Sequence, residues 1–192
     1  QGHAGRQKIN KITRYLGIFF AFLLGYMLFA PKNNLMIAVL IGSFLIMLLG
    51  LFDDMTKSET PMPNKYKVLV QLIVAAIVVF YGGLELTKIT LFGMTITFTS
   101  IPFLSEFLSI LIIVATINAI NLIDGLDGLC AGISSIYFLT IAIIGFILNK
   151  FGGLDVILSL IMLGSTLGYL VHNFPPARIY QGDAGSTFLG FM

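Results

Sequence analysis

Three polar clusters interrupt an otherwise apolar sequence, and each carries carboxylates that could bind a cation or accept a proton. The clusters are GLFDDM at 50–55, NAINLIDGLDGL at 118–129 and NFPPARIYQGDAGS at 173–186. Adjacent carboxylates such as Asp53 and Asp54 repel each other and are costly close to lipid. This pair is compatible with Mg²⁺ binding, with a proton acceptor beside a metal ligand, or with a solvated helix end.

The second cluster places a polar residue at every third position. These residues are Asn118, Asn121, Asp124 and Asp127. On a helix, this spacing keeps the first three on one face, directed away from lipid. Their amide and carboxylate oxygens suit a hard cation or the polar groups of a ligand.

The third cluster combines a helix stop, a cation and an acid. Pro175 and Pro176 end the preceding helix, and Arg178 could form a forked contact with a phosphate. Asp183 is flanked by small residues. We expect it to lie just before the N-terminus of a helix, where backbone N–H groups favour anions. Tyr180 is compatible with stacking on a base and equally with an ordinary interfacial aromatic.

The composition indicates a membrane protein. The 192 residues are 57% hydrophobic and 10% charged, and the mean hydropathy is +0.98. A soluble domain carries about 25% charged residues. A net charge of +2 gives no basic surface for nucleic acid, and the single Cys130 excludes an internal disulfide.

Charge-free apolar runs predict transmembrane helices, because about 20 such residues cross the hydrocarbon core. The predicted spans are 15–30, 35–52, 68–84, 107–123, 128–148 and 156–171, with a seventh beginning near Ser186. The fold class is therefore an all-α integral membrane protein. We expect a single membrane domain, residues 1–192, forming a polytopic bundle of about six full spans and a truncated seventh.

Two further features complete this picture. Residues 85–100 alternate apolar and polar types around a Phe-Gly pair, which predicts a small β-hairpin outside the membrane. The chain opens with Gln1 and stops at Met192 inside an apolar run. We therefore expect a fragment of a longer protein that lacks the first span and the C-terminal part.

Alternation of the spans sorts the loops into two sides. Three basic residues fall on the side of residues 31–34, 85–106 and 149–155. Eight fall on the other side: Arg6, Lys8, Lys11, Arg14, Lys57, Lys65, Lys67 and Arg178. This excess predicts that the second side is cytoplasmic. The three acidic clusters lie on that same side.

Carboxylates for Mg²⁺ together with cations for phosphate are what phosphoryl transfer requires. The alternative is an ion- or proton-coupled membrane transporter, because intramembrane carboxylates also mark ion pathways. A transport site belongs near the bilayer midplane, whereas these acids gather at one boundary. A CDP-alcohol type of membrane phosphotransferase also uses several aspartates, but its pattern is only partly matched by DGLDGLCAG at 124–132.

The three motifs, in this order and separated by spans, resemble the polyprenyl-phosphate N-acetylhexosamine-1-phosphate transferases of glycosyltransferase family 4. The matching pieces are GLFDDM with KYKVLVQ, NAINLIDGLDGL, and NFPPARIYQGDAGSTFLGF. The resemblance implies a Mg²⁺-dependent enzyme, with Mn²⁺ as an alternative metal. It would move a sugar 1-phosphate from a UDP-N-acetylhexosamine to undecaprenyl phosphate and release UMP. UDP-GlcNAc is the donor that we expect.

The resemblance also implies a cellular setting. The enzyme would start a cell-envelope glycan pathway from the bacterial plasma membrane, with its active site on the cytoplasmic face. A second copy of the chain, forming a homodimer, is among the expected partners. The histidine-containing loop that helps the family recognise its sugar lies beyond Met192. We therefore expect the fragment alone to be inactive.

Carried over by position, the resemblance gives each polar residue a role. Asp53 matches the base that deprotonates the lipid phosphate, and Asp54 beside it is the second predicted catalytic residue. Asp183 matches the metal ligand, and Asp124 is the second predicted metal residue. The predicted substrate-binding residues are Lys57, Lys67, Asn121, Asp124, Asp127, Asn173 and Tyr180. Gln181 stands where the family usually has Met, a change that we expect to be tolerated because this side chain need not face the metal.

Overall fold

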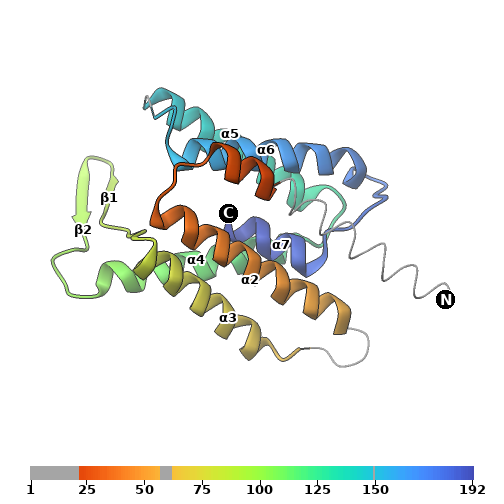
Figure 1. The fold of residues 1–192 in the computed structure, drawn as a ribbon, viewed down its shortest axis with the longest axis horizontal. Helices are drawn as coiled ribbons and strands as arrows, with labels where there is room; N and C mark the ends of the chain where they lie inside the picture. Colours follow the sequence, from red (N-terminus) through yellow and green to blue (C-terminus); the bar gives the residue numbers. More distant parts are fainter. Residues whose placement is uncertain (1–21, 57–61, 149) are drawn as a thin grey trace.

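The computed structural model describes residues 22–56, 62–148 and 150–192. Figure 1 shows a helical bundle with one small hairpin projecting from it. Residues 22–29 are helical. The other helices are α2 (Asn34–Thr56), α3 (Asn64–Ala76) with its π-helical continuation η1 (Ile77–Tyr81), α4 (Leu104–Ile123), α5 (Leu129–Ile147), α6 (Leu154–Asn173) and α7 (Gly182–Phe191).

Within the described residues, five helices are long and apolar enough to cross a membrane: α2, α3 with η1, α4, α5 and α6. They confirm five predicted spans to within four residues at each end. The predicted span 15–30 lies partly outside the described residues, and its part from 22 to 29 is helical.

The start of α3 differs from the prediction by four residues, because the helix begins at Asn64 and not at residue 68. Pro63 precedes it with φ −59° and ψ 133°. The fixed φ of proline suits the start of a helix, so the helix begins directly after it. Lys65 and Lys67 therefore belong to the first turn of a helix and not to a loop.

The helices pack in two groups. α5 and α6 pair with each other, whereas α7 packs between α2 and α4 in a second group that also contains α3 (Figure 1). Close approach of α7 depends on glycine. A Cβ on Gly190 would lie 2.7 Å from Cα of Ile117, and one on Gly50 would lie 2.6 Å from the backbone nitrogen of Ala184. Small residues let membrane helices approach to this extent.

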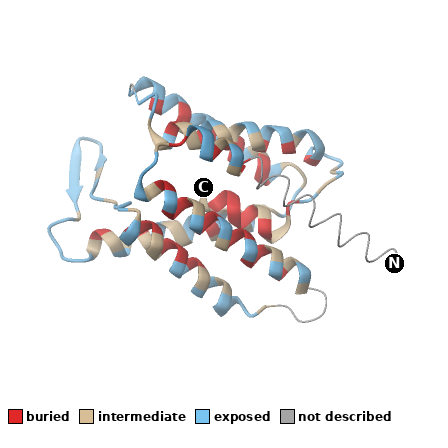
Figure 2. Ribbon diagram, viewed as in Figure 1, coloured by how far each residue is buried: buried red, intermediate tan, exposed pale blue. Residues whose placement is uncertain are grey.

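The start of α7 differs from the prediction. The helix begins at Gly182, four residues before Ser186, so Asp183 lies in its first turn and not ahead of it. Most of α7 is buried, as Figure 2 shows. Phe188 of α7 makes an edge-to-face contact with Phe22 at 5.3 Å, and both belong to the main core.

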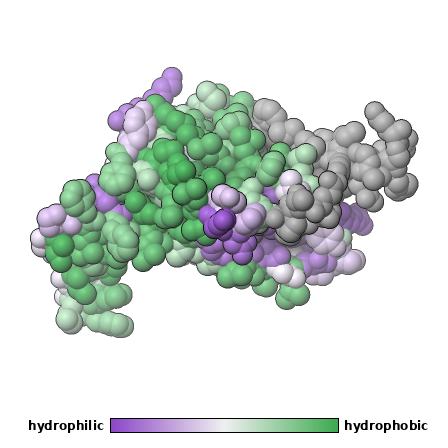
Figure 3. All heavy atoms as spheres, turned by 90° about the horizontal axis from the view of Figure 1, so that it is seen from below, coloured by the Kyte–Doolittle hydropathy of each residue, from purple (hydrophilic) through white to green (hydrophobic). Residues whose placement is uncertain are grey.

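The surface of the bundle is mainly apolar. Figure 3 shows hydrophobic residues over the middle of one face, with hydrophilic residues gathered in smaller areas. Many large side chains of the spans are exposed, among them Phe44, Phe80 and Phe107. This distribution is what a helix bundle in lipid requires, since its outer surface contacts hydrocarbon.

The predicted β-hairpin is confirmed. Strands β1 (Lys88–Leu91) and β2 (Met94–Thr97) pair antiparallel, with Leu91 opposite Met94. Phe92 and Gly93 form the turn with φ of 51° and 82°. Positive φ at both turn residues matches the twist of the strands. The hairpin lies at the end of the bundle opposite the start of α7 (Figure 1).

Candidate active site

Two carboxylates converge on one ammonium group. Nζ of Lys67 donates to Oδ2 of Asp53 at 2.6 Å and to Oδ2 of Asp183 at 3.2 Å. Asp53 is 2% exposed, so its charge needs this partner. Lys67 and Asp183 keep 25% and 21% exposure, which leaves the cluster open to solvent. We call these three residues the Asp53–Lys67–Asp183 cluster.

Three helix ends build this cluster. Asp53 lies in the last turn of α2, Lys67 in the first turn of α3, and Asp183 in the first turn of α7. α2 ends and α3 begins at the same end of the bundle, and α7 begins there beside α2. Asp53 and Asp183 come from two of the acidic clusters that we expected on one side of the membrane, and the structure brings both into contact with Lys67.

Asp54 points to a different partner from Asp53. Its Oδ1 accepts the backbone N–H of Asp183 and its Oδ2 accepts that of Ala184, both at 3.1 Å. The helix N-terminus that we expected to attract an anion therefore already holds one, from α2. Successive helix residues point about 100° apart, which explains why neighbouring aspartates reach different groups.

The carboxylate oxygens of the cluster suit a hard cation. No group of three or more His, Cys, Asp or Glu side chains in the described part of the chain is arranged to hold a metal ion. Asp53 and Asp183 nevertheless both contact one cationic atom, Nζ of Lys67. Mg²⁺ commonly takes one or two carboxylates and completes its coordination with phosphate oxygens and water. The residues fit a Mg²⁺ that binds together with a phosphate, while the metal roles of Asp183 and Asp124 stay predictions.

The polar row of the second motif serves several neighbours. Nδ2 of Asn118 donates to Oε1 of Gln71 in α3 at 2.6 Å, and Nδ2 of Asn121 donates to Oγ of Ser186 in α7 at 2.8 Å. Asp124 caps the end of α4. The two amides thus join α4 to α3 and α7. Ser186, the partner of Asn121, lies one helix turn after Asp183 in α7. Its predicted contact with substrate stays a prediction.

Asn173 and Asp127 connect two loops at this end of the bundle. Oδ1 of Asn173 accepts the N–H of Gly128 at 3.0 Å, and its Nδ2 donates to the carbonyl of Ile179 at 2.9 Å. Oδ2 of Asp127 accepts the N–H of Ala177 at 2.9 Å. Both side chains therefore hold backbone of residues 174–181 against residues 124–128, and their substrate roles stay predictions.

The remaining predicted residues differ in what the structure says of them. Tyr180 is 64% exposed on the loop that leads into α7, so its ring is available to a ligand. Arg178 lies on the same loop, where its backbone N–H bonds the carbonyl of His172 at 2.9 Å. Lys57 lies outside the described residues.

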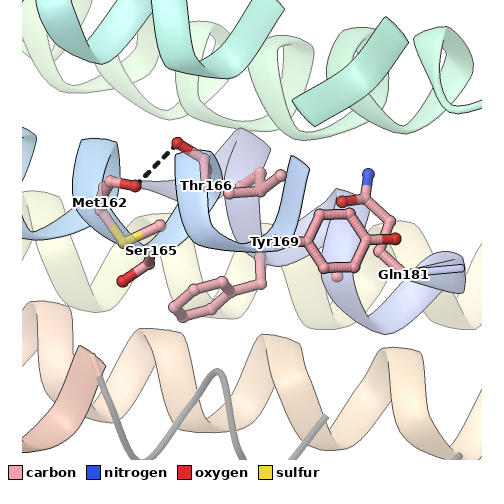
Figure 4. A pocket seen from close by; sticks show the side chains of 8 residues that line it. Met162, Ser165, Thr166, Tyr169 and Gln181 are labelled. Atoms are coloured by element: carbon pink, nitrogen blue, oxygen red, sulfur yellow. Dashed lines mark hydrogen bonds between the residues drawn. The ribbon is translucent and has the colours of Figure 1, made fainter. Parts of the chain in front are cut away.

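Sequence reasoning missed two buried polar residues, Gln71 and Ser186, and the surroundings of Gln181. Gln71 is 2% exposed, and Ser186 is fully buried. Gln181 is 4% exposed and lines a small pocket between α6 and α7 beside Tyr169 (Figure 4). Its Nε2 has no hydrogen-bond partner within the described part of the chain. Only Gln71 gave a signal, since it is the one polar residue inside the apolar run 68–84.

These features define a polytopic helical membrane protein with a carboxylate–lysine cluster at one end of its bundle. The chain belongs to glycosyl transferase family 4, whose model matches residues 36–192. This membership confirms the family resemblance seen in the three motifs.

Three curated relatives carry names that describe related activities. "Probable undecaprenyl-phosphate N-acetylglucosaminyl 1-phosphate transferase" of Bacillus subtilis (strain 168) is 42% identical, over 81% of this chain and 41% of its own length. "Decaprenyl-phosphate N-acetylglucosaminephosphotransferase" of Mycolicibacterium smegmatis is 32% identical, over 96% and 47%. "Phospho-N-acetylmuramoyl-pentapeptide-transferase" of Shouchella clausii is 35% identical, over 99% and 59%. The chain thus spans about half the length of these relatives.

Proposed function

We propose that the full-length protein transfers a sugar 1-phosphate from a UDP-sugar to a polyprenyl phosphate. The observation that carries this proposal is the Asp53–Lys67–Asp183 cluster, where two carboxylates meet one cation at 2.6 and 3.2 Å. Phosphoryl transfer needs such charges, because positioning and neutralisation supply most of its catalysis. Family membership and the names of the relatives support the same reaction.

In this reaction an oxygen of the lipid phosphate attacks the β-phosphorus of the UDP-sugar. A new phosphorus–oxygen bond forms, the bond from the β-phosphorus to the bridging oxygen breaks, and UMP leaves with that oxygen. Asp53 accepts the proton of the lipid phosphate when that group arrives protonated. Lys67 holds Asp53 in place and offers its cation to the phosphates. The carboxylate of Asp183 lies 3.2 Å from the same Lys67 nitrogen.

A bound Mg²⁺ would supply neutralisation of the charge that develops on the phosphate oxygens. Asp183 is the side chain that we assign to hold it, with Asp53 next to it. Tyr180 is exposed near the start of α7 and is assigned to stack on the uracil.

We assign GlcNAc as the donor sugar and undecaprenyl phosphate as the acceptor. The 42% identical relative carries both in its name, whereas the relatives named for N-acetylmuramoyl-pentapeptide are 32–37% identical. We also assign the cluster to the cytoplasmic face of the bacterial plasma membrane. The support is the excess of basic residues in the loops at that end of the bundle.

The location of the cluster argues against a coupled transporter. A transport site lies near the bilayer midplane, where helices are broken or repeats meet. Asp53, Lys67 and Asp183 lie in terminal turns of their helices. This placement favours an enzyme that works at the membrane boundary.

The test measures UMP release by the full-length protein from UDP-GlcNAc and undecaprenyl phosphate, with and without Mg²⁺. Asp183→Asn and Asp53→Asn should each lower turnover at least about 100-fold, as removal of a proton-transfer group or a charge-stabilising group does. Asp155→Asn, at the opposite end of the bundle, is the control and should retain wild-type turnover. Mg²⁺-dependent release at the normal rate by Asp183→Asn would contradict the metal assignment, and wild-type protein without release would contradict the function.

A further inference from the structure

The contact between Asp54 and α7 has a consequence for the proposed reaction. Asp54 lies next to the cluster in sequence, yet both of its carboxylate oxygens bond backbone N–H groups, those of Asp183 and Ala184. Four N–H groups at the start of any α-helix lack an intrahelical acceptor. Asp54 satisfies two of them from a different helix.

The start of α7 has no cap of its own. Gln181 is the N-cap residue, and its side chain makes no capping hydrogen bond. The negative carboxylate of Asp54 is favourably placed against the positive end of the helix dipole. The first turn of α7 therefore depends on α2 for its capping.

The backbone contact at Gly50 fixes the distance between the two helices. Gly50 lies one turn before Asp54 in α2, and a Cβ there would lie 2.6 Å from the nitrogen of Ala184 and 2.8 Å from the carbonyl oxygen of Asp183. Contact at Gly50 and hydrogen bonding at Asp54 thus hold the same two residues of α7. Asp183 can shift little relative to α2 while both contacts persist.

We propose that Asp54 is a positioning residue that fixes the carboxylate of Asp183 beside Lys67 by holding the Asp183 backbone. This role differs from the catalytic role that the resemblance implies for Asp54, because both Asp54 oxygens bond the backbone of α7. Asp53 shapes the cluster through its carboxylate, whereas Asp54 acts through another residue. The inference rests on the proposed function only for its effect on turnover.

The first measurement is hydrogen exchange of the full-length protein, without metal or substrate. In Asp54→Ala, the amides of the first turn of α7 should exchange about tenfold faster, since a cap and two hydrogen bonds are lost. Asp54→Asn keeps one acceptor oxygen and should lie between Asp54→Ala and wild type. Asp183→Asn should leave this exchange unchanged, because the Asp183 backbone is intact. Asp155→Asn, which alters an acid in the first turn of α6, is the matched control.

The second measurement is the Mg²⁺ concentration that gives half-maximal UMP release. In Asp54→Asn it should rise about tenfold, because a shifted Asp183 binds the ion less well. Faster exchange in α7 together with this rise supports the positioning role. Unchanged exchange would overturn it, and so would faster exchange in all helices with an unchanged Mg²⁺ requirement. If the wild-type protein releases no UMP, the proposed function fails, while hydrogen exchange still decides the contact.

Discussion

At the scale of single residues, Lys67 is the side chain on which the cluster depends. It is the only cation in hydrogen-bond contact with Asp53 and Asp183 in the described part of the chain. Removing it leaves the buried carboxylate of Asp53 without a counter-charge, which is more costly than removing both partners. The effects on stability of replacing Lys67 and of replacing Asp53 should therefore be strongly non-additive.

We expect Lys67→Met to destabilise the protein by about 2 kcal/mol, less than the roughly 3–5 kcal/mol for a fully buried pair, since Lys67 is partly exposed. The double variant Lys67→Met with Asp53→Asn should recover about 1 kcal/mol of this loss. Denaturation of the purified protein in detergent micelles measures both values. Lys67→Arg keeps the charge and serves as the control. Additive effects of the two single changes would show that the ion pair contributes nothing.

Residue types were predicted better than residue partners. The adjacent carboxylates at 53–54 were recognised as an unusual pair. Their different partners follow from the packing of α7 against α2, which the spacing of residues in the sequence does not reveal. Likewise Asn173 and Asp127 were predicted as substrate-binding residues through the family resemblance. Their partners are backbone groups of other loops. Every residue carries such groups, so the sequence of side chains does not indicate which of them is the partner.

At the scale of elements, α7 connects the separate motifs. It contacts α2 through Gly50 and α4 through Gly190, and it carries Asp183 in its first turn. Glycine is needed at both positions because backbone atoms of the partner helix occupy the space of a side chain.

Gly190→Ala should cost about 1–3 kcal/mol, because its Cβ would overlap the backbone of α4 at Ile117, and a packed backbone cannot move aside cheaply. Thermal unfolding in detergent should show a clear fall in melting temperature. Gly132→Ala in α5 and Gly164→Ala in α6 are matched controls, since nothing lies within 4 Å of a Cβ at either position. Both should be neutral or stabilising, as alanine favours a helix. Equal stability of Gly190→Ala and the controls would contradict the observed packing.

Element boundaries show where sequence prediction stops. The apolar runs located five spans, because hydrocarbon thickness fixes their length. The starts of α3 and α7 were each predicted four residues late. In both cases charged or polar residues begin the helix, and hydropathy excludes such residues even when tertiary contacts hold them helical.

At the scale of the whole molecule, the bundle has two chemically different ends. The end of α2 and the starts of α3 and α7, which carry the Asp53–Lys67–Asp183 cluster, lie at one end, and the β-hairpin lies at the other (Figure 1). Tyr180 lies two residues before α7, at the end with the cluster. The alternation of spans predicted this separation, because loops that follow successive helices must lie on alternate sides.

Labelling of single cysteines in intact cells tests the orientation. Phe92→Cys at the fully exposed hairpin turn should react with a membrane-impermeant maleimide from outside, whereas Tyr180→Cys should react only after the cells are opened. The native Cys130 is 1% exposed and should remain unlabelled in both. Labelling of Tyr180→Cys in intact cells would reverse the assignment of the cytoplasmic face.

The central place of α7 also bears on biosynthesis. This helix is synthesised after every other described element, although it packs between α2 and α4 in the group that also contains α3. Transmembrane helices insert individually before they associate. The contacts of α7 with α2 and α4 therefore form only after both of those helices have been synthesised, and Asp54 lacks its backbone partners until residues 182–191 have emerged. The contact of Asp183 with Lys67 forms in that same late step.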